Sequence, residues 1–430
     1  MKMHRSVTAL ALASSLALVS AGCGDKNEAA AGGTTGGTSD AFAVDTSKCP
    51  SDATKAISDG ADIKIGTVGP LSGPYAVLGG PISEGMKTYF AKVNADGGVD
   101  GHKLELVAKD DGYDPTKTLP QVTELLQKDK VFATLGQLGT APVAAAQPLA
   151  EQTCTPQLWV GAGAPQFGDP ANHPWTTIGF MSYSTEAQAW ADYLKQTKPA
   201  AKIAYLQVET EGGDAYASSF EKAATDLGLD IVAHEKTAPD AASVENEMTN
   251  LLAAKPDVVI LMSVATSCAK AMGALAEGGY RGSTITAYSC ASTTIFPMLG
   301  AAANGATFLS INKDPEDLPD FLADVEKFGD GVKPSDETLN GYRFADILVK
   351  NLRAAAKLKG GLTKANVMDA AWHLDATWFG AWGGSAKLDG EKDAYSLEYG
   401  QMLTYDAAKK TYSPAGPPTE REGKTGSYEG

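Results

Sequence analysis

Short apolar segments alternate with amphipathic segments along most of this 430-residue chain. Runs such as Ile63–Val68 and Asp257–Met262 have the length and β-branched content of buried strands. Between such runs, apolar residues recur at helical spacing, for example at Ile82, Met86 and Phe90. Strands and helices that alternate in this way are typical of α/β folds with a parallel sheet. The sequence therefore predicts an α/β architecture.

The strand-like segments fall into two similar series. We expect the first series at Ile63–Val68, Lys103–Ala108, Val131–Leu135, Gln157–Val160 and Thr176–Phe180. A second series begins with a helix at Ser184–Gln196 and continues with strands at Lys202–Val208, Leu229–Ala233, Asp257–Met262 and Thr284–Ala287. No floppy linker separates the series, so we expect two lobes that share a hinge and enclose a cleft.

The loops after the expected strands are rich in Gly, Ser and Thr. They are Gly69–Gly73, Gly136–Thr140, Gly161–Ala164, Ser263–Ser267 and Ser289–Thr294. Ligands of open parallel sheets bind beyond the carboxyl ends of the strands, where these loops lie. Small residues let N–H groups and hydroxyls approach an anionic group such as a carboxylate. Alternatively, the loops are tight strand-to-helix turns.

The N-terminus has the layout of a secretory signal. Lys2 and Arg5 precede the apolar run Val7–Val19, which is too short to span a bilayer, and small residues follow it. Cys23 directly after Ala-Gly resembles the lipobox of bacterial lipoproteins, although Ser20 stands where lipoboxes usually have Leu. The resemblance implies that residues 1–22 are removed and that Cys23 carries a diacylglycerol. The alternative is an ordinary cleaved signal with an incidental cysteine.

Residues 23–61 are expected to form a tether and an N-terminal extension. The run 29–40 is rich in Gly and Thr and has no apolar periodicity, as in flexible linkers. No other segment is long and apolar enough to cross a membrane, so we expect an exported protein anchored by lipid alone. The formal charge of −16 becomes −18 when Lys2 and Arg5 leave, which argues against binding to nucleic acid or to an anionic membrane surface.

Four cysteines remain once Cys23 is set aside. An even number in an exported protein favours two disulfides, with three possible pairings. We favour Cys49–Cys154 and Cys268–Cys290, because the second pair would join the start of a helix to the end of the next strand. No CxxC or HxxxH spacing points to zinc, so the sequence predicts no metal site and no cofactor.

The segment from Ile65 to Pro115 carries the most specific motifs. It contains GPLSGPYAVLG and then EGMKTYFAKVNADGGVDGHKLELVAKDDGYDP. This segment closely resembles the start of the leucine/isoleucine/valine-binding proteins of branched-chain amino-acid ABC importers, which are type I periplasmic binding proteins. The resemblance extends over about residues 62–410. It implies two Rossmann-like lobes joined by a three-strand hinge, with a small-molecule ligand held between them. Closure of the lobes around the ligand would present both lobes to an ABC permease.

The same resemblance sets the expected boundaries of the lobes. Lobe 1 is expected to comprise 62–180 and 311–395, and lobe 2 to comprise 181–310 and 396–415. Residues 416–430 are polar and rich in Pro and Gly, so we expect a disordered tail there. We expect the protein to be a monomer.

Pocket residues follow from the resemblance one by one. Thr140 matches the hydroxyl residue that hydrogen-bonds a ligand carboxylate, and Gly161, Ala162 and Gly163 match the next loop, with Gly163 in place of the usual Thr. Leu78 occupies a first-loop position that is aromatic in amino-acid binders. Further candidates are the loop residues Ser72, Gln137 and Thr266 and the possible aromatic walls Tyr183, Tyr216 and Tyr342.

The expected partner of a ligand ammonium is missing. Amino-acid binders of this family place an acid where this chain has Ser289. A desolvated ammonium without a charged partner loses several kcal/mol, so either another acid serves or the ligand has no ammonium. The nearest candidate acids are Glu209, Glu211 and Asp214. Ligands that remain open are a branched-chain amino acid or related carboxylate, an aromatic acid, an amide and urea.

Two other classes of function stay open. A receptor for a membrane sensor would use the same fold. A surface-tethered enzyme is the least favoured class, because no GxSxG, HExxH or P-loop pattern is present. The pair Asp110 and Asp111 resembles paired acid–base carboxylates, but the family uses these residues to end a strand and fix a turn.

Overall fold

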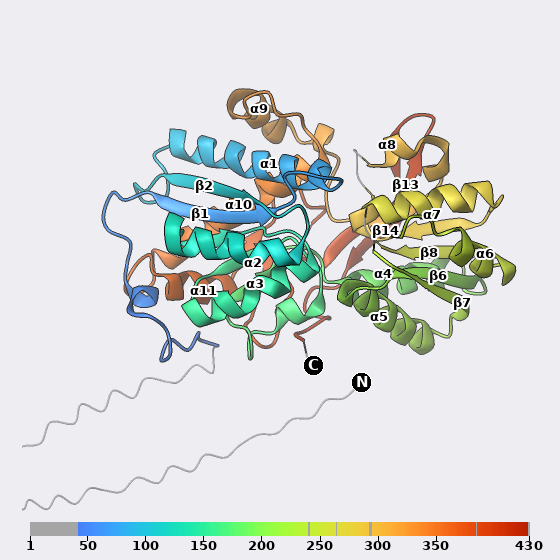
Figure 1. Ribbon diagram of the computed structural model, residues 1–430, viewed down its shortest axis with the longest axis horizontal. Helices are drawn as coiled ribbons and strands as arrows, with labels where there is room; N and C mark the ends of the chain where they lie inside the picture. Colours follow the sequence, from blue (N-terminus) through green and yellow to red (C-terminus); the bar gives the residue numbers. More distant parts are fainter. Residues whose placement is uncertain (1–41, 240, 264, 292–294, 384, 429–430) are drawn as a thin grey trace, which may run out of the picture. The chain divides into compact units, whose positions relative to one another are not determined.

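The computed structural model describes residues 42–239, 241–263, 265–291, 295–383 and 385–428. The expected signal segment, Cys23 and the Gly/Thr-rich run lie outside these residues. Ala41–Gly430 forms one compact unit that contains two large β-sheets, each flanked by helices (Figure 1). The prediction of an α/β fold with central parallel sheets is confirmed. Among the described residues, no helix is both long and apolar enough to cross a bilayer.

The first sheet is wholly parallel and has the order β2-β1-β3-β4-β5. Its strands are β1 (Ile63–Gly69), β2 (Leu104–Asp110), β3 (Ala133–Leu135), β4 (Gln157–Val160) and β5 (Thr176–Ile178). Its helices are α1 (Ala76–Ala95), α2 (Pro115–Glu124), α3 (Thr140–Thr153), α9 (Pro319–Phe328), α10 (Asp336–Ala355) and α11 (Lys364–Trp372). The buried strand positions are mostly apolar, as expected of a sheet covered on both faces.

The second sheet has the order β14-β13-β10-β9-β8-β6-β7. The strands β6 (Lys202–Val208), β7 (Asp230–Thr237), β8 (Val258–Met262), β9 (Ser283–Thr286) and β10 (Thr307–Ser310) are parallel. Two antiparallel strands, β13 (Tyr399–Asp406) and β14 (Thr411–Glu420), extend one edge. The accompanying helices are α4 (Tyr183–Thr197), α5 (Glu211–Leu227), α6 (Glu245–Ala253), α7 (Ala265–Glu277) and α8 (Ile295–Leu299). A separate two-stranded sheet pairs β11 (Asp375–Thr377) with β12 (Ser385–Lys387).

The described chain passes between the two sheets three times: after β5, after β10 and before β13. The second passage delivers α10 back to the first sheet, where it packs against α1. A Cβ atom at Gly85 of α1 would lie 2.0 Å from the carbonyl oxygen of Thr338, and one at Gly341 of α10 would lie 1.8 Å from that of Ile82. The two glycines therefore allow a backbone contact that any other residue would prevent.

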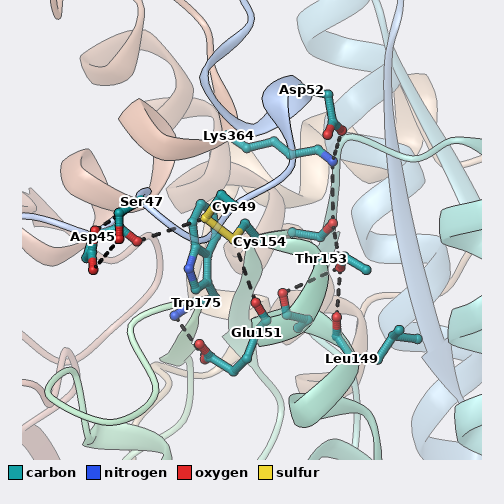
Figure 2. The surroundings of a disulfide bond; sticks show 12 residues. Asp45, Ser47, Cys49, Asp52, Leu149, Glu151, Thr153, Cys154, Trp175 and Lys364 are labelled. Carbon is teal, nitrogen blue, oxygen red and sulfur yellow. Dashed lines mark hydrogen bonds and ion pairs between the residues drawn. A yellow bond between two sulfur atoms is a disulfide. The ribbon is translucent and has the colours of Figure 1, made fainter.

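The N-terminal extension is attached to the body from residue 42 onward. The 3-10 helix η1 (Ser51–Thr54) packs on α11, and Lys364 Nζ lies 2.8 Å from Asp52 Oδ2. The Cys49–Cys154 disulfide ties this extension to the end of α3 (Figure 2). The structure also contains the disulfide Cys268–Cys290, so both pairs are those favoured from the sequence.

The expectation of a disordered tail at 416–430 is wrong for the described part of that segment. Residues up to Glu420 belong to β14, which pairs with β13 on one side only. An edge strand tolerates Pro, because the missing N–H groups face no neighbour. Beyond β14, the Arg421 N–H donates to the Glu398 carbonyl and the Tyr428 N–H to the Gly168 carbonyl. The polar, Pro- and Gly-rich composition indicated disorder because composition carries no information about strand pairing.

The two disulfides differ in the length of chain that they close, 105 and 22 residues. The chain-entropy model assigns about 4.7 kcal/mol to a loop of roughly 100 residues and about 3 kcal/mol to a short loop. We therefore expect C49S/C154S to lose more stability than C268S/C290S. Urea unfolding of both double variants measures the difference, and an equal or reversed order would contradict it.

Candidate functional site

A cavity of about 90 Å³ lies among loops that follow strands of both sheets. Leu138 follows β3, Gly161 follows β4, and Met181 follows β5. The second sheet contributes residues after β6 and β9, and α10 contributes its first turn. The cavity therefore occupies the expected place beyond the carboxyl ends of parallel strands. The volume is below the roughly 300–1,000 Å³ of most small-molecule sites, because aromatic rings project into it.

Six aromatic residues line the cavity. They are Tyr75, Tyr113, Phe180, Tyr183, Tyr216 and Tyr288. The rings of Tyr75 and Tyr113 lie 4.6 Å apart, and those of Tyr183 and Tyr216 stack at 4.3 Å. Tyr216 also stacks on the buried Trp190 at 5.1 Å. The aromatic walls are therefore held by ring contacts and do not depend on a ligand for their position.

Besides Glu337, which is 3% exposed, Glu186 is a buried acid of the cavity, with 2% of its surface exposed. It lies in the first turn of α4, where the helix dipole favours a negative charge. The Tyr216 hydroxyl donates to Oε2 at 2.5 Å, and the Tyr288 N–H donates to Oε1 at 2.7 Å. Burial raises the pKa of Glu186 to about 8, despite these two donors. The carboxyl group is thus poised to change charge near neutral pH.

Five of the residues expected from the sequence line the cavity: Leu78, Gly161, Tyr183, Tyr216 and Ser289. Ser289 does not act as an acid substitute, because its hydroxyl donates to the Ser263 carbonyl at 2.9 Å. Leu78 provides no aromatic ring at its position, but Tyr75 and Tyr113 contribute aromatic rings to the same cavity.

Thr140 does not line the cavity, because a tyrosine stands in front of it. Its hydroxyl oxygen lies 3.2 Å from the Tyr183 hydroxyl oxygen. A Cβ atom at Gly163 would come within 2.5 Å of the Tyr183 ring. The ring therefore takes the space that a Thr at position 163 would need, and the expected carboxylate contact of Thr140 goes to the tyrosine.

Other expected residues that the structure describes also lie outside the cavity lining. Gln137 accepts from Gln157 Nε2 at 2.8 Å within the first sheet, and Ala162 packs into an apolar cluster. Tyr342 is buried between α1 and α9, and its hydroxyl donates to Asp324. Ser72 lies in the turn after β1, where its N–H donates to Asp110. The side chain of Thr266 lies outside the described part of the chain.

The candidate acids Glu209, Glu211 and Asp214 do not line the cavity. Glu211 and Asp214 are exposed in the first turn of α5, where Asp214 lies 3.1 Å from Lys236 Nζ and Glu211 accepts from Gln166. The sequence missed Glu186 because an acid in the first helical turn usually faces solvent. Its position one helical turn after Tyr183 was the available signal.

The acidic pair Asp110 and Asp111, at the end of β2, fixes a turn. Asp110 Oδ1 accepts N–H bonds from Leu71 and Gly112. Asp111 accepts from the Thr118 hydroxyl and the Tyr113 N–H, both at 2.8 Å. These bonds hold Tyr113 at a positive φ of 68°, with its ring at the cavity. The pair therefore positions an aromatic wall.

Residues 62–390 match the family model described as periplasmic binding protein. The chain belongs to this family. It is 25% identical over 302 residues to Leu/Ile/Val-binding protein homolog 1 of Brucella suis biovar 1, covering 70% of this chain and 79% of that relative. Leu/Ile/Val-binding protein homolog 7 of Brucella abortus is 26% identical over 232 residues, which span 52% of this chain and only 58% of that relative.

Two solved structures show the same two-lobed fold. One is a branched-chain amino acid ABC transporter protein from Thermus thermophilus with bound valine, with a TM-score of 0.74 and 20% identity over 84% of this chain and 96% of that chain. The other is a fatty acid ABC transporter substrate-binding protein from Thermomonospora curvata, with a TM-score of 0.74 and 22% identity over 86% of this chain and 95% of that chain. At this identity the likeness establishes the fold.

The raised pKa of Glu186 predicts a measurable effect on stability. A carboxyl group whose pKa is about 8 when folded, and near 4.5 otherwise, binds its proton more tightly in the folded state. Its contribution to stability therefore falls as pH rises from about 5 to 8. Glu186→Gln cannot ionise, so we expect its unfolding midpoint in urea to vary less over this range than that of the unmodified protein.

Glu151→Gln is the matched control. Glu151 is partly buried, and its pKa is raised to about 7, but it contacts Trp175 away from the cavity. Both variants should flatten the pH profile, and only Glu186→Gln should also change ligand binding. An unchanged profile in Glu186→Gln would show that Glu186 is ionised throughout this range.

Proposed function

We propose that this protein is an extracytoplasmic solute-binding component of an ABC importer. It captures a small organic ligand between its two lobes and delivers it to the permease. The observation that carries this proposal is the cavity, whose walls come from loops of both sheets. A ligand that contacts both walls stabilises the arrangement in which they face each other. Membership in the periplasmic binding protein family supports the same function.

A polar network joins the cavity to the passages between the sheets. The Tyr288 hydroxyl lies 3.1 Å from Asn340 Oδ1 on α10, and Asn312 Nδ2 donates to both groups. Asn312 follows β10, at the second passage, and accepts from Arg343 Nη1 at 2.6 Å. Tyr288 in turn donates its N–H to Glu186. We propose that this network transmits ligand contacts at Glu186 to the hinge.

The apolar part of the ligand is expected to contact aliphatic side chains. Ile82, Leu138 and Ile295 line the cavity together with the aromatic rings. Burial of a compact hydrocarbon group against them contributes roughly 25 cal/mol for each Å² removed from water. Relatives are named for the binding of Leu/Ile/Val, and one solved structure is named for fatty acid, so an apolar body is a feature that such ligands share.

A blocked cavity tests the proposal. Ala291 is buried and lines the cavity, so Ala291→Trp should fill the space that the ligand needs. A thermal-shift screen of the purified protein against amino acids, aromatic acids, amides, urea and amines is expected to give stabilising compounds, because ligands of the folded state raise Tm. Ala291→Trp should abolish their effect.

Met298→Trp is the control, because Met298 lies nearby on α8 with 74% of its surface exposed. It should keep the response to every stabilising compound. Recovery of each compound chemically unchanged is also expected. An equal response in Ala291→Trp, or turnover of a compound, would contradict the proposed function.

We also propose that the mature protein begins at Cys23 and is held at the membrane by a lipid on that residue. The lipobox-like sequence and the short apolar run before it support this proposal. Cys23→Ser should remove the lipid while leaving the body intact. Radiolabelled palmitate should enter the unmodified protein and not the variant, and the variant should move to the soluble fraction. Continued labelling of Cys23→Ser would refute the anchor.

A further inference from the structure

We infer that the ligand is a small organic cation, an amine or quaternary ammonium on a compact apolar body, which contacts Glu186 and the tyrosine rings. The inference rests on the proposed function and names the class of ligand for the same cavity. It departs from the carboxylate that the glycine-rich loops predicted.

The first step concerns the donors that a carboxylate would need. The Leu138 N–H donates to Val68, the Gly139 N–H to Gly161, and the Gly161 N–H to Gln137. These are the small-residue loops in which free N–H groups were expected. Because these three N–H groups already donate to backbone carbonyls, they are not available to an anion.

The second step concerns the hydroxyl and amide donors of the other wall. The Ser289 hydroxyl donates to Ser263, and the Tyr216 hydroxyl donates to Glu186. The Tyr288 N–H donates to Glu186, and the Ala291 N–H donates to the Tyr288 carbonyl. An entering carboxylate would lose its hydration and gain no hydrogen bond from these four donors.

The third step concerns charge. Among the described residues that line the cavity, the ionisable side chains other than tyrosines are the acids Glu186, Asp336 and Glu337, and none is Lys or Arg. Glu186 is almost fully buried and belongs to the wall. The faces of aromatic rings attract cations when the two are within about 6 Å. In its ionised form, an acid surrounded by tyrosine rings therefore complements a positive nitrogen and repels a carboxylate.

The fourth step concerns the proton on Glu186. Burial raises the pKa of Glu186 to about 8, and a cation beside it favours the charged form. The groups that face Glu186 are Tyr183 on α4, Tyr216 on α5 and Tyr288 after β9, while Asp336 and Glu337 on α10 line the same cavity. Burial also raises the pKa of these three tyrosines, so they stay neutral. Binding of a cation should therefore release a proton below pH 8 and strengthen as pH rises.

The test compares three probes that share one hydrocarbon body. 3-Methylbutylamine carries only the positive group of leucine, 4-methylpentanoate carries only the negative group, and leucine carries both. Isothermal titration of the purified protein at pH 8 measures each affinity. We expect 3-methylbutylamine to bind at least about tenfold more tightly than 4-methylpentanoate. Leucine should bind less tightly than the amine, because its carboxylate finds no partner.

Variants and the pH dependence of binding test whether Glu186 is the residue that contacts the cation. Glu186→Gln should weaken the amine by about ten- to a hundredfold, whereas Glu151→Gln should not change its affinity. Tetramethylammonium does not titrate, so its affinity should rise from pH 6 to pH 8.5 through Glu186 alone and stay flat in Glu186→Gln. An equal loss in both variants would overturn the role of Glu186.

Different results would refute the inference of a cationic ligand and the proposed solute-binding function. If 4-methylpentanoate or leucine binds more tightly than both cations, or if neither cation binds, the inference of a cationic ligand is wrong. The proposed function still stands in that case when Ala291→Trp abolishes the response to whichever compound does bind. It fails when no compound of the wider screen stabilises the protein.

Discussion

The hydrogen bonds of Glu186 connect three segments that meet at the cavity. One oxygen accepts from Tyr216 on α5, and the other accepts from the backbone of Tyr288 after β9. Glu186 itself lies in the first turn of α4, directly after the first passage between the sheets. A buried carboxyl group must be hydrogen-bonded or neutral. Glu186 accepts two hydrogen bonds, and its raised pKa favours the neutral form. Glu186 therefore connects three segments of the cavity wall, and its charge is one that a ligand can alter.

Tyrosine side chains pack into the loops where a carboxylate site was expected. Tyr183 lies against Thr140 and occupies the space above Gly163, and Tyr113 packs so closely on Gly139 that a Cβ atom there would lie 2.7 Å from its ring. The small residues of these loops therefore make room for aromatic rings. In the sequence, the same glycines indicated room for a ligand, because a glycine does not specify which group approaches it.

The sequence predicted the fold well because local patterns determine most of it. The strands expected at Gln157–Val160 and Lys202–Val208 were placed to the residue, and both disulfides followed from the even cysteine count and the expected elements. The site was predicted less well. Five expected residues line the cavity, but Tyr75, Tyr113 and Glu186 reach it through turns and helix orientations that no periodicity records. Residues 416–420 were misassigned because strand pairing at a sheet edge overrides composition.

A crystal structure of the protein with a compound that stabilises it tests the central claim most directly. We predict electron density for the compound in the cavity, with its positive nitrogen within hydrogen-bonding or ion-pair distance of the Glu186 carboxylate and its apolar part against the tyrosine rings. Density at another place, or a bound carboxylate group directed at Thr140 with Tyr183 displaced, would contradict the account.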